Sequence, residues 1–217
     1  MNRIILDTEF VNLQKSFIYN LGYVVVNENG DMLKKRDFVI EQIWHNRELF
    51  ATSYYYNKRN IYISKMRGKR MNLVKWGECV RIMLKDIKDF NISELWAYNV
   101  RADYNAINFM VKWYKTRNPL EKLNCYDIWD LTKEIFLKND NYKKFCEIYN
   151  FVTKNGFFKC TAETCYAFIT NNPNYVEEHT ALSDSIIETI ILYNTINEVE
   201  NYKETGQRWL KNRSSSF

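Results

Sequence analysis

Three groups of side chains, far apart in the chain, have types and spacings that suit the binding of a hard metal ion. Asp7 and Glu9 end an apolar, β-branched run, so in a strand both carboxylates would point to one side. Asp103 follows the run 95–98 and is expected in the first turn of a helix. His179 precedes Asp184 by five residues, where the last long apolar helix is expected to begin.

Each group taken alone has an ordinary explanation. The paired acids suit a solvated strand end, Asp103 suits the start of a helix, and a lone histidine suits a surface. Like charges held two residues apart are nevertheless costly unless a cation neutralises them. The order of all three groups along one chain therefore carries more weight than any single group.

The elements that must position these groups follow from the spacing of apolar residues. The pattern predicts five strands, at 3–6, 17–26, 33–40, 95–98 and 125–128, with a turn at 27–30 between the second and third. It predicts helices at 72–90, 102–114, 161–170 and 182–199, and a further helix capped by Asp127 or Asp130. Hairpin-linked strands followed by alternating strands and helices predict an α/β fold, a mixed sheet flanked by helices.

Length and charge predict one domain with a partner that carries negative charge. The 217 residues suit a domain at 1–200 with a basic C-terminal tail at 201–217. The net charge is +5, and residues 49–77 hold seven lysines and arginines but no acid. Such a concentrated basic segment favours a polyanion, with Arg67, Lys69 and Arg70 as phosphate contacts and nearby tyrosines as stacking surfaces; a solvated surface loop is the alternative.

Cysteine usage and hydropathy predict a reduced, cytoplasmic protein. The five cysteines form no Cys-x-x-Cys pair. The N-terminus does not resemble a signal peptide, and no apolar run approaches the roughly 20 residues that span a membrane. Frequent Asn, Lys, Ile and Tyr suit an AT-rich bacterial or viral genome. The sequence leaves a homodimer as an open alternative to a monomer.

Together, the acids and the histidine resemble the DEDDh family of 3′→5′ exonucleases, which includes oligoribonuclease, ribonuclease T and the proofreading subunit of bacterial DNA polymerase III. His179, Ala181 and Asp184 match the family's His-x-Ala-x-x-Asp, and the resemblance covers residues 4–191. It implies a ribonuclease H-like fold with a mixed five-stranded sheet flanked by helices. It also implies hydrolysis of single-stranded DNA or RNA from the 3′ end to nucleoside 5′-monophosphates.

The resemblance assigns a role to each site residue. Asp7 would bridge two divalent cations, Glu9 and Asp184 would complete the first site, and Asp103 would hold the second cation directly or through water. His179 would be the general base. Carboxylate ligands favour Mg²⁺ or Mn²⁺, and two such ions supply both an activated water and a stabilised leaving group.

The substrate contacts follow the family less closely. Asn99 matches an asparagine that supports the site, and Leu13 keeps an apolar side chain that would wedge between terminal bases. Phe10 stands where the family commonly has a threonine, which puts ribose recognition in doubt. Ala102 replaces a frequent aromatic residue. Two other functions therefore stay open: hydrolysis of short or cyclic oligonucleotides, and a subunit that binds nucleic acid or a polymerase with little activity.

Overall fold

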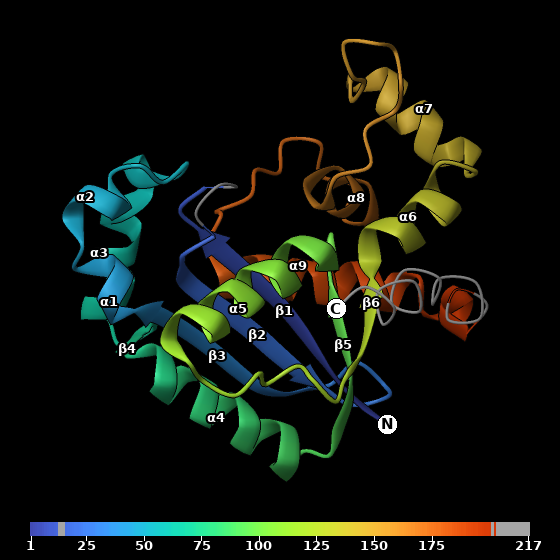
Figure 1. Ribbon diagram of the computed structural model, residues 1–217. Coiled ribbons are helices and arrows are strands. Elements are labelled where there is room, and N and C mark those ends of the chain that lie inside the picture. The colour runs from blue at the N-terminus through green and yellow to red at the C-terminus, as the bar shows by residue number, and fades with distance from the viewer. Residues whose placement is uncertain (13–15, 201, 203–217) are drawn as a thin grey trace.

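A mixed sheet of six strands forms the centre of the molecule (Figure 1). The computed structural model describes residues 1–12, 16–200 and 202. The strand order is β4-β3-β2-β1-β5-β6. β2 is antiparallel to both its neighbours, whereas β5 and β6 continue parallel to β1 and β4 is parallel to β3. The strands are β1 (Asn2–Phe10), β2 (Ile18–Val26), β3 (Met32–Ile40), β4 (Asn72–Val74), β5 (Ile92–Ala97) and β6 (Asn124–Asp127).

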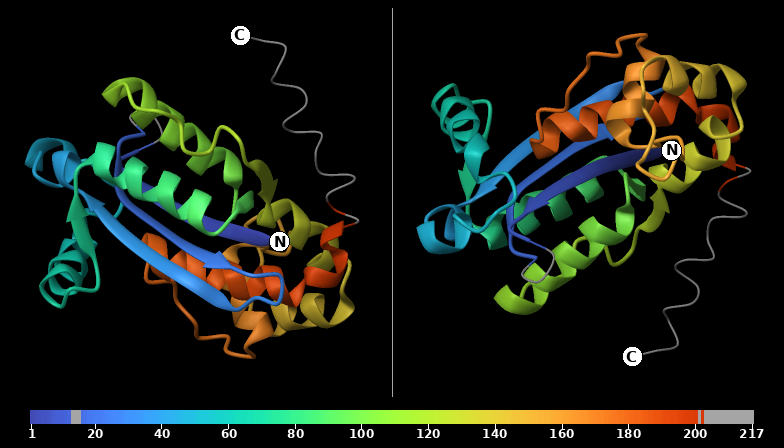
Figure 2. Two further views of the ribbon diagram at one scale, coloured as in Figure 1. Left: turned by 90° about the horizontal axis from the view of Figure 1, so that it is seen from below. Right: turned by 90° about the horizontal axis from the view of Figure 1, so that it is seen from above.

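Helices cover both faces of the sheet (Figure 2). On one face α4 (Trp76–Asp89) and α5 (Val100–Tyr114) pack over the core that contains Ile4 and Leu6. On the other face α9 (Ala181–Asn194) packs over the core that contains Ile5. The remaining helices extend the two ends of the sheet: α1 (Glu41–Trp44), α2 (Arg47–Phe50), a 3₁₀ turn (Tyr56–Lys58) and α3 (Arg59–Arg67) near β3, and α6 (Ile128–Phe136), α7 (Asp140–Ile148), α8 (Ala162–Ile169) and a 3₁₀ turn (Ile196–Glu198) near β6.

The predicted α/β class is confirmed, and the sheet has one strand more than the five expected. The predicted helix at 72–90 is wrong at its start, because Asn72–Val74 pairs with the end of β3 and the helix begins only at Trp76. Leu73, expected on the buried face of that helix, is 42% exposed. The last predicted helix was also too long, since α9 ends at Asn194. Asp127 is the N-cap of α6, as one of the two predicted caps.

Several features expected from the sequence fall on the part of the chain that is not described. Leu13 and residues 203–217 of the expected basic tail lie outside the described residues. Within the described residues, the helices are too short or too polar to cross a membrane.

The start of α9 lies unusually close to β2. A Cβ atom on Gly22 would come within 2.1 Å of the Leu182 backbone nitrogen, so only glycine permits this approach. The buried Asn20 side chain accepts a hydrogen bond from the Ala181 backbone N–H at 2.8 Å. The Ser185 hydroxyl donates to the Gly22 carbonyl at 3.1 Å. These contacts fix the first turn of α9 over the middle of the sheet.

Candidate active site

Alternation along β1 directs two acids to the face that α9 covers. Ile5 belongs to the core under α9, whereas Ile4 and Leu6 belong to the opposite core. Asp7 and Glu9 have the same parity as Ile5, so they project toward α9. The sequence prediction that both carboxylates point to one side is consistent with this arrangement.

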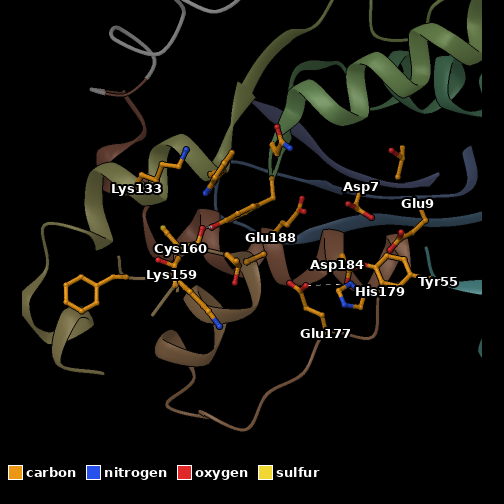
Figure 3. A pocket seen from close by; sticks show the side chains of 18 of the residues that line it. Asp7, Glu9, Tyr55, Lys133, Lys159, Cys160, Glu177, His179, Asp184 and Glu188 are labelled. Atoms are coloured by element: carbon orange, nitrogen blue, oxygen red, sulfur yellow. Dashed lines mark hydrogen bonds and ion pairs between the residues drawn. The ribbon is translucent and has the colours of Figure 1, made fainter. Parts of the chain in front are cut away.

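α9 brings further acids to the same place. Asp184 lies in its first turn and Glu188 one turn later, and both are buried. Residues four apart on a helix share a face, so both side chains turn toward β1. Figure 3 shows Asp7, Glu9, Asp184 and Glu188 around one hollow, with His179 beside Asp184. Glu9, His179 and Asp184 each offer one ligand atom within 4.8 Å of the others.

His179 is held by residues of the basic segment. Its ring stacks on Tyr55, with centroids 4.5 Å apart and planes 14° from parallel. The Tyr62 hydroxyl donates to the His179 carbonyl at 3.1 Å. Lys58 donates to the Glu178 carbonyl at 2.9 Å, and Lys65 binds the Glu178 carboxylate at 2.7 Å. Lys58 and Lys65 belong to the basic segment that was expected to meet phosphate. In the structure they hold Glu178, the residue before His179.

Asp103 lies beside these acids, but its carboxylate binds β1 beyond the point where β1 stops pairing with β5. β1 pairs with β5 only as far as Ile5, so the N–H of Thr8 has no partner strand on that side. The Asp103 Oδ1 accepts hydrogen bonds from this N–H at 2.8 Å and from the Thr8 hydroxyl at 2.7 Å. Asp103 is therefore the predicted acid that is most engaged by the protein itself, and it does not line the pocket described below.

The acids open into a pocket of about 610 Å³. One wall carries Tyr55, Glu177 and His179, and the floor carries the acids of β1 and α9. The pocket then continues along α6 and the segment before α8, where its lining is mixed aromatic, basic and small: Trp129, Lys133, Leu137, Thr153, Phe158, Lys159, Cys160, Thr161 and Ala162. This shape provides an anionic centre with an adjoining surface suited to bases and phosphates.

Crowding raises the proton affinity of the carboxylates. Burial, followed by repulsion from Asp103 and Glu188, holds the pKa of Asp7 well above its usual range. Burial and repulsion from Glu177 raise the pKa of Asp184 to about 8, although Lys58 opposes the shift. Burial also raises the pKa of Asp103 to about 7, against the hydrogen bonds from Thr8. Such mutual repulsion is expected of acids arranged to hold cations.

The donor set fits divalent cations. Three carboxylate oxygens in this group (Asp7 Oδ2, Asp184 Oδ1 and Glu188 Oε2) are buried and have no hydrogen-bond partner among the described residues. Buried polar atoms in proteins are nearly always satisfied, so unpaired oxygens that converge on one pocket indicate a bound group. Oxygen donors favour hard cations such as Mg²⁺ or Mn²⁺. Asp7, Glu9 and Asp184 are the predicted residues best placed to hold them.

Sequence reasoning missed two residues of the site and gave a third, Tyr55, a different role. Glu188 follows Asp184 by four residues, the spacing that places both on one face of a helix. Glu177 places a carboxylate oxygen 3.7 Å from the His179 Nδ1. Tyr55 was expected to stack on bases, and in this structure it stacks on His179.

The predicted substrate contacts are dispersed. Asn99 is exposed and lines the pocket, with its backbone in the left-handed region at the start of α5. Phe10 packs against the main core. Arg67, Lys69 and Arg70 are exposed at the end of α3, and none of the three lines the pocket. Their contacts with substrate stay predictions.

The chain folds like a known nuclease. No family model matches it, and no curated protein matches it in sequence. Two structures of E. coli Exonuclease I in complex with dT13 or 5cy-dT13 oligonucleotides match its fold, with TM-scores of 0.53 and 0.55 and identities of 11% and 10%. They cover 94% of this chain. The fold is ribonuclease H-like. The chain spans less than half of each Exonuclease I chain, 43% and 42%.

Proposed function

We propose that this protein is a metal-dependent 3′→5′ exonuclease that releases nucleoside 5′-monophosphates from single-stranded DNA or RNA. The observation that carries the proposal is the convergence of Asp7, Glu9, Asp184 and His179 on one pocket. The likeness of the fold to oligonucleotide-bound Exonuclease I supports the substrate class. The order of the site residues, which resembles the DEDDh family, supports the direction.

In this proposal the acids bind the metal ions and His179 accepts a proton. Asp7, Glu9 and Asp184 would hold two divalent cations, Mg²⁺ or Mn²⁺, which supply positive charge to the phosphate and lower the pKa of water. His179 would accept the proton of the attacking water. Glu177 lies on the Nδ1 side of His179, so it would orient the ring and leave Nε2 for that proton. Burial and the charge of Lys58 lower the pKa of His179, which keeps the imidazole neutral and able to act as a base.

The lining of the pocket supports a single strand as substrate. Phe158 presents a ring and Lys159 a charge along the extension that leads away from the acids, where Lys133 lies over the ring of Trp129. Rings stack on bases without regard to sequence, and lysines meet phosphates. The extension therefore suits the nucleotides that precede the scissile bond better than a dinucleotide, which would leave it unused.

Asp184→Asn tests this function. The amide keeps the volume but removes a negative ligand, so turnover of a 5′-labelled single-stranded 30-mer with Mn²⁺ should fall at least about 100-fold. The melting temperature without metal should stay the same or rise, because carboxylate crowding is relieved. A ladder of products that shortens from the 3′ end establishes direction.

Two controls separate the competing functions. Glu121→Gln changes an exposed carboxylate away from the pocket and should leave turnover unchanged. Turnover of a dinucleotide but not of the 30-mer would instead favour the hydrolase of short oligonucleotides. Tight binding of the 30-mer by the wild-type protein, without products, would favour the binding subunit and contradict the proposal.

A further inference from the structure

Glu188 is a buried acid without an assigned task. It lies on α9 one turn after Asp184, its residue is 3% exposed, and it lines the pocket beside Asp7 (Figure 3). Its Oε2 has no hydrogen-bond partner among the described residues. An unpaired carboxyl group at such a position costs free energy in either protonation state, because the charged form lacks a cation and the neutral form lacks an acceptor for its proton.

The neighbours of Glu188 do not supply that partner. The charges with the largest effect on its pKa belong to Asp103, Asp184 and Glu177, which are all acids. A hydrogen bond from the Tyr98 backbone is the favourable contact that it receives. An apolar side chain would fit this part of α9 at lower cost, since the adjacent Ile187 and the later Ile191 are buried there without difficulty. A carboxylate at this position therefore indicates that Glu188 binds a ligand.

The site has room for Glu188 on the side away from His179. Glu9, His179 and Asp184 form one compact group of donors. Figure 3 shows Asp7 between Glu188 and this group, and Asp103 and Glu188 are the acids that raise its pKa most. Of these two acids, Asp103 already accepts two hydrogen bonds from Thr8 at its Oδ1. Asp103 thus has one oxygen committed, whereas the Glu188 Oε2 is free to bind.

We propose that Glu188 is a metal ligand, and that it holds the second of the two divalent cations together with Asp7. The inference rests on the proposed metal-dependent function and adds a fifth carboxylate to the four that the sequence predicted. Asp103 then supports this cation through its remaining oxygen or through water. The additional negative charge favours a small, hard cation at the second position.

Glu188→Gln tests the assignment by metal binding rather than by activity. Calorimetric titration with Mn²⁺ is carried out with and without a saturating nucleoside 5′-monophosphate. The wild-type protein should bind two ions in the presence of the nucleotide. The Gln variant should retain one ion with affinity within about twofold and bind the second at least about tenfold more weakly. Its melting temperature without metal should match the wild type, since glutamine keeps the shape and accepts the hydrogen bond from Tyr98.

Glu121→Gln is the control for the loss of one negative charge, because Glu121 is exposed and lies away from the acids. It should bind both ions as the wild type does. Two ions bound with wild-type affinity by Glu188→Gln would overturn the proposal, as would a lowered melting temperature with unchanged Mn²⁺ binding, which marks a scaffold residue. Failure of the proposed function is separate: the wild type would bind two ions in a manner that depends on Glu188, yet degrade no oligonucleotide.

Discussion

His179 shows at the scale of one residue how the site is preorganised. Its φ of +54° lies in the left-handed region, which is costly for a residue with a side chain. Two contacts stabilise this conformation: Tyr62 donates a hydrogen bond to the His179 carbonyl, and Tyr55 stacks on the His179 ring. The imidazole is therefore fixed between the acids and Glu177 before substrate arrives.

His179→Asn should lower kcat by about 10²–10⁴, the usual loss when a general base is removed. Asparagine tolerates a positive φ, so the loop should keep its path and the melting temperature should stay near that of the wild type. Steady-state kinetics on the labelled 30-mer and Mn²⁺ titration measure the two properties separately. Unchanged kcat would contradict the role as a base, and a loss of Mn²⁺ affinity in proportion to kcat would assign His179 as a ligand instead.

The sequence contained enough to predict which residues meet, but less about how each is used. Alternation predicted that Asp7 and Glu9 share one side of a strand, and the resemblance to the DEDDh family implied that they meet His179 and Asp184. The structure places all four in one pocket. Their chemical roles stay predictions. Lys58 and Lys65 looked like phosphate contacts, and only the tertiary structure shows that they bind Glu178. The spacing of Glu188 from Asp184 placed both on one face of the helix, but spacing alone does not show that an acid in an apolar helix lines a site.

At the scale of elements, the site depends on the contact between α9 and β2. Asp184 and Glu188 reach β1 only because the helix backbone approaches the strand at Gly22. Asn20 caps the first N–H of α9 from the sheet, a task that the Thr180 N-cap side chain does not perform. The helix end and the strand are thus fixed by a side chain that is distant in sequence.

Gly22→Ala should displace the start of α9 and reduce both stability and turnover. The added methyl group would meet backbone atoms, 2.1 Å from the Leu182 nitrogen, which cannot turn aside as a side chain can. Overpacking of this kind costs about 1–3 kcal/mol or more of the free energy of unfolding. Denaturant unfolding and kinetics on the 30-mer measure both effects.

Gly77→Ala provides the control, since nothing lies within 4 Å of its added Cβ and the residue is within α4. That variant should be more stable by about 0.5–1 kcal/mol with unchanged turnover. Normal turnover by Gly22→Ala would show that the position of α9 is not critical to the acids.

Helices and strands were predictable where the periodic pattern of apolar residues continued over enough residues to be recognised. β1, β2, β3, β5 and β6 were expected, as were α5, α8 and α9, with ends that differ by a few residues. β4 was missed because three residues carry no reliable alternation, and its pairing with β3 at the sheet edge is a tertiary effect. The short helices between β3 and β4 were not predicted either, since four-residue helices such as α1 and α2 show no period.

At the scale of the molecule, two groups of helices extend opposite ends of the sheet (Figure 1), and residues from both sides line the pocket. Tyr55, on the side of α1 to α3, forms one wall, and Trp129 of α6 and Phe158 form part of the other. A strand that enters along α6 would place its end at the acids. Arg67, Lys69 and Arg70 lie on the other side, at the end of α3, so they would meet a long strand only if it entered past α3 instead.

Replacement of Arg67, Lys69 and Arg70 together by glutamine tests whether this exposed basic surface guides a long strand. If it does, KM for a single-stranded 30-mer should rise, and its dependence on salt should weaken by about one unit of slope for each lost phosphate contact. Turnover of a dinucleotide should hardly change, because a short substrate does not extend from the acids to α3. The matched control replaces Lys85, Lys88 and Lys122, which are also exposed and lie away from the pocket. It removes the same net charge, so an equal effect of both triple variants would assign the change to overall charge. An equal loss on the 30-mer and the dinucleotide would show that α3 supports the site itself and does not guide the strand.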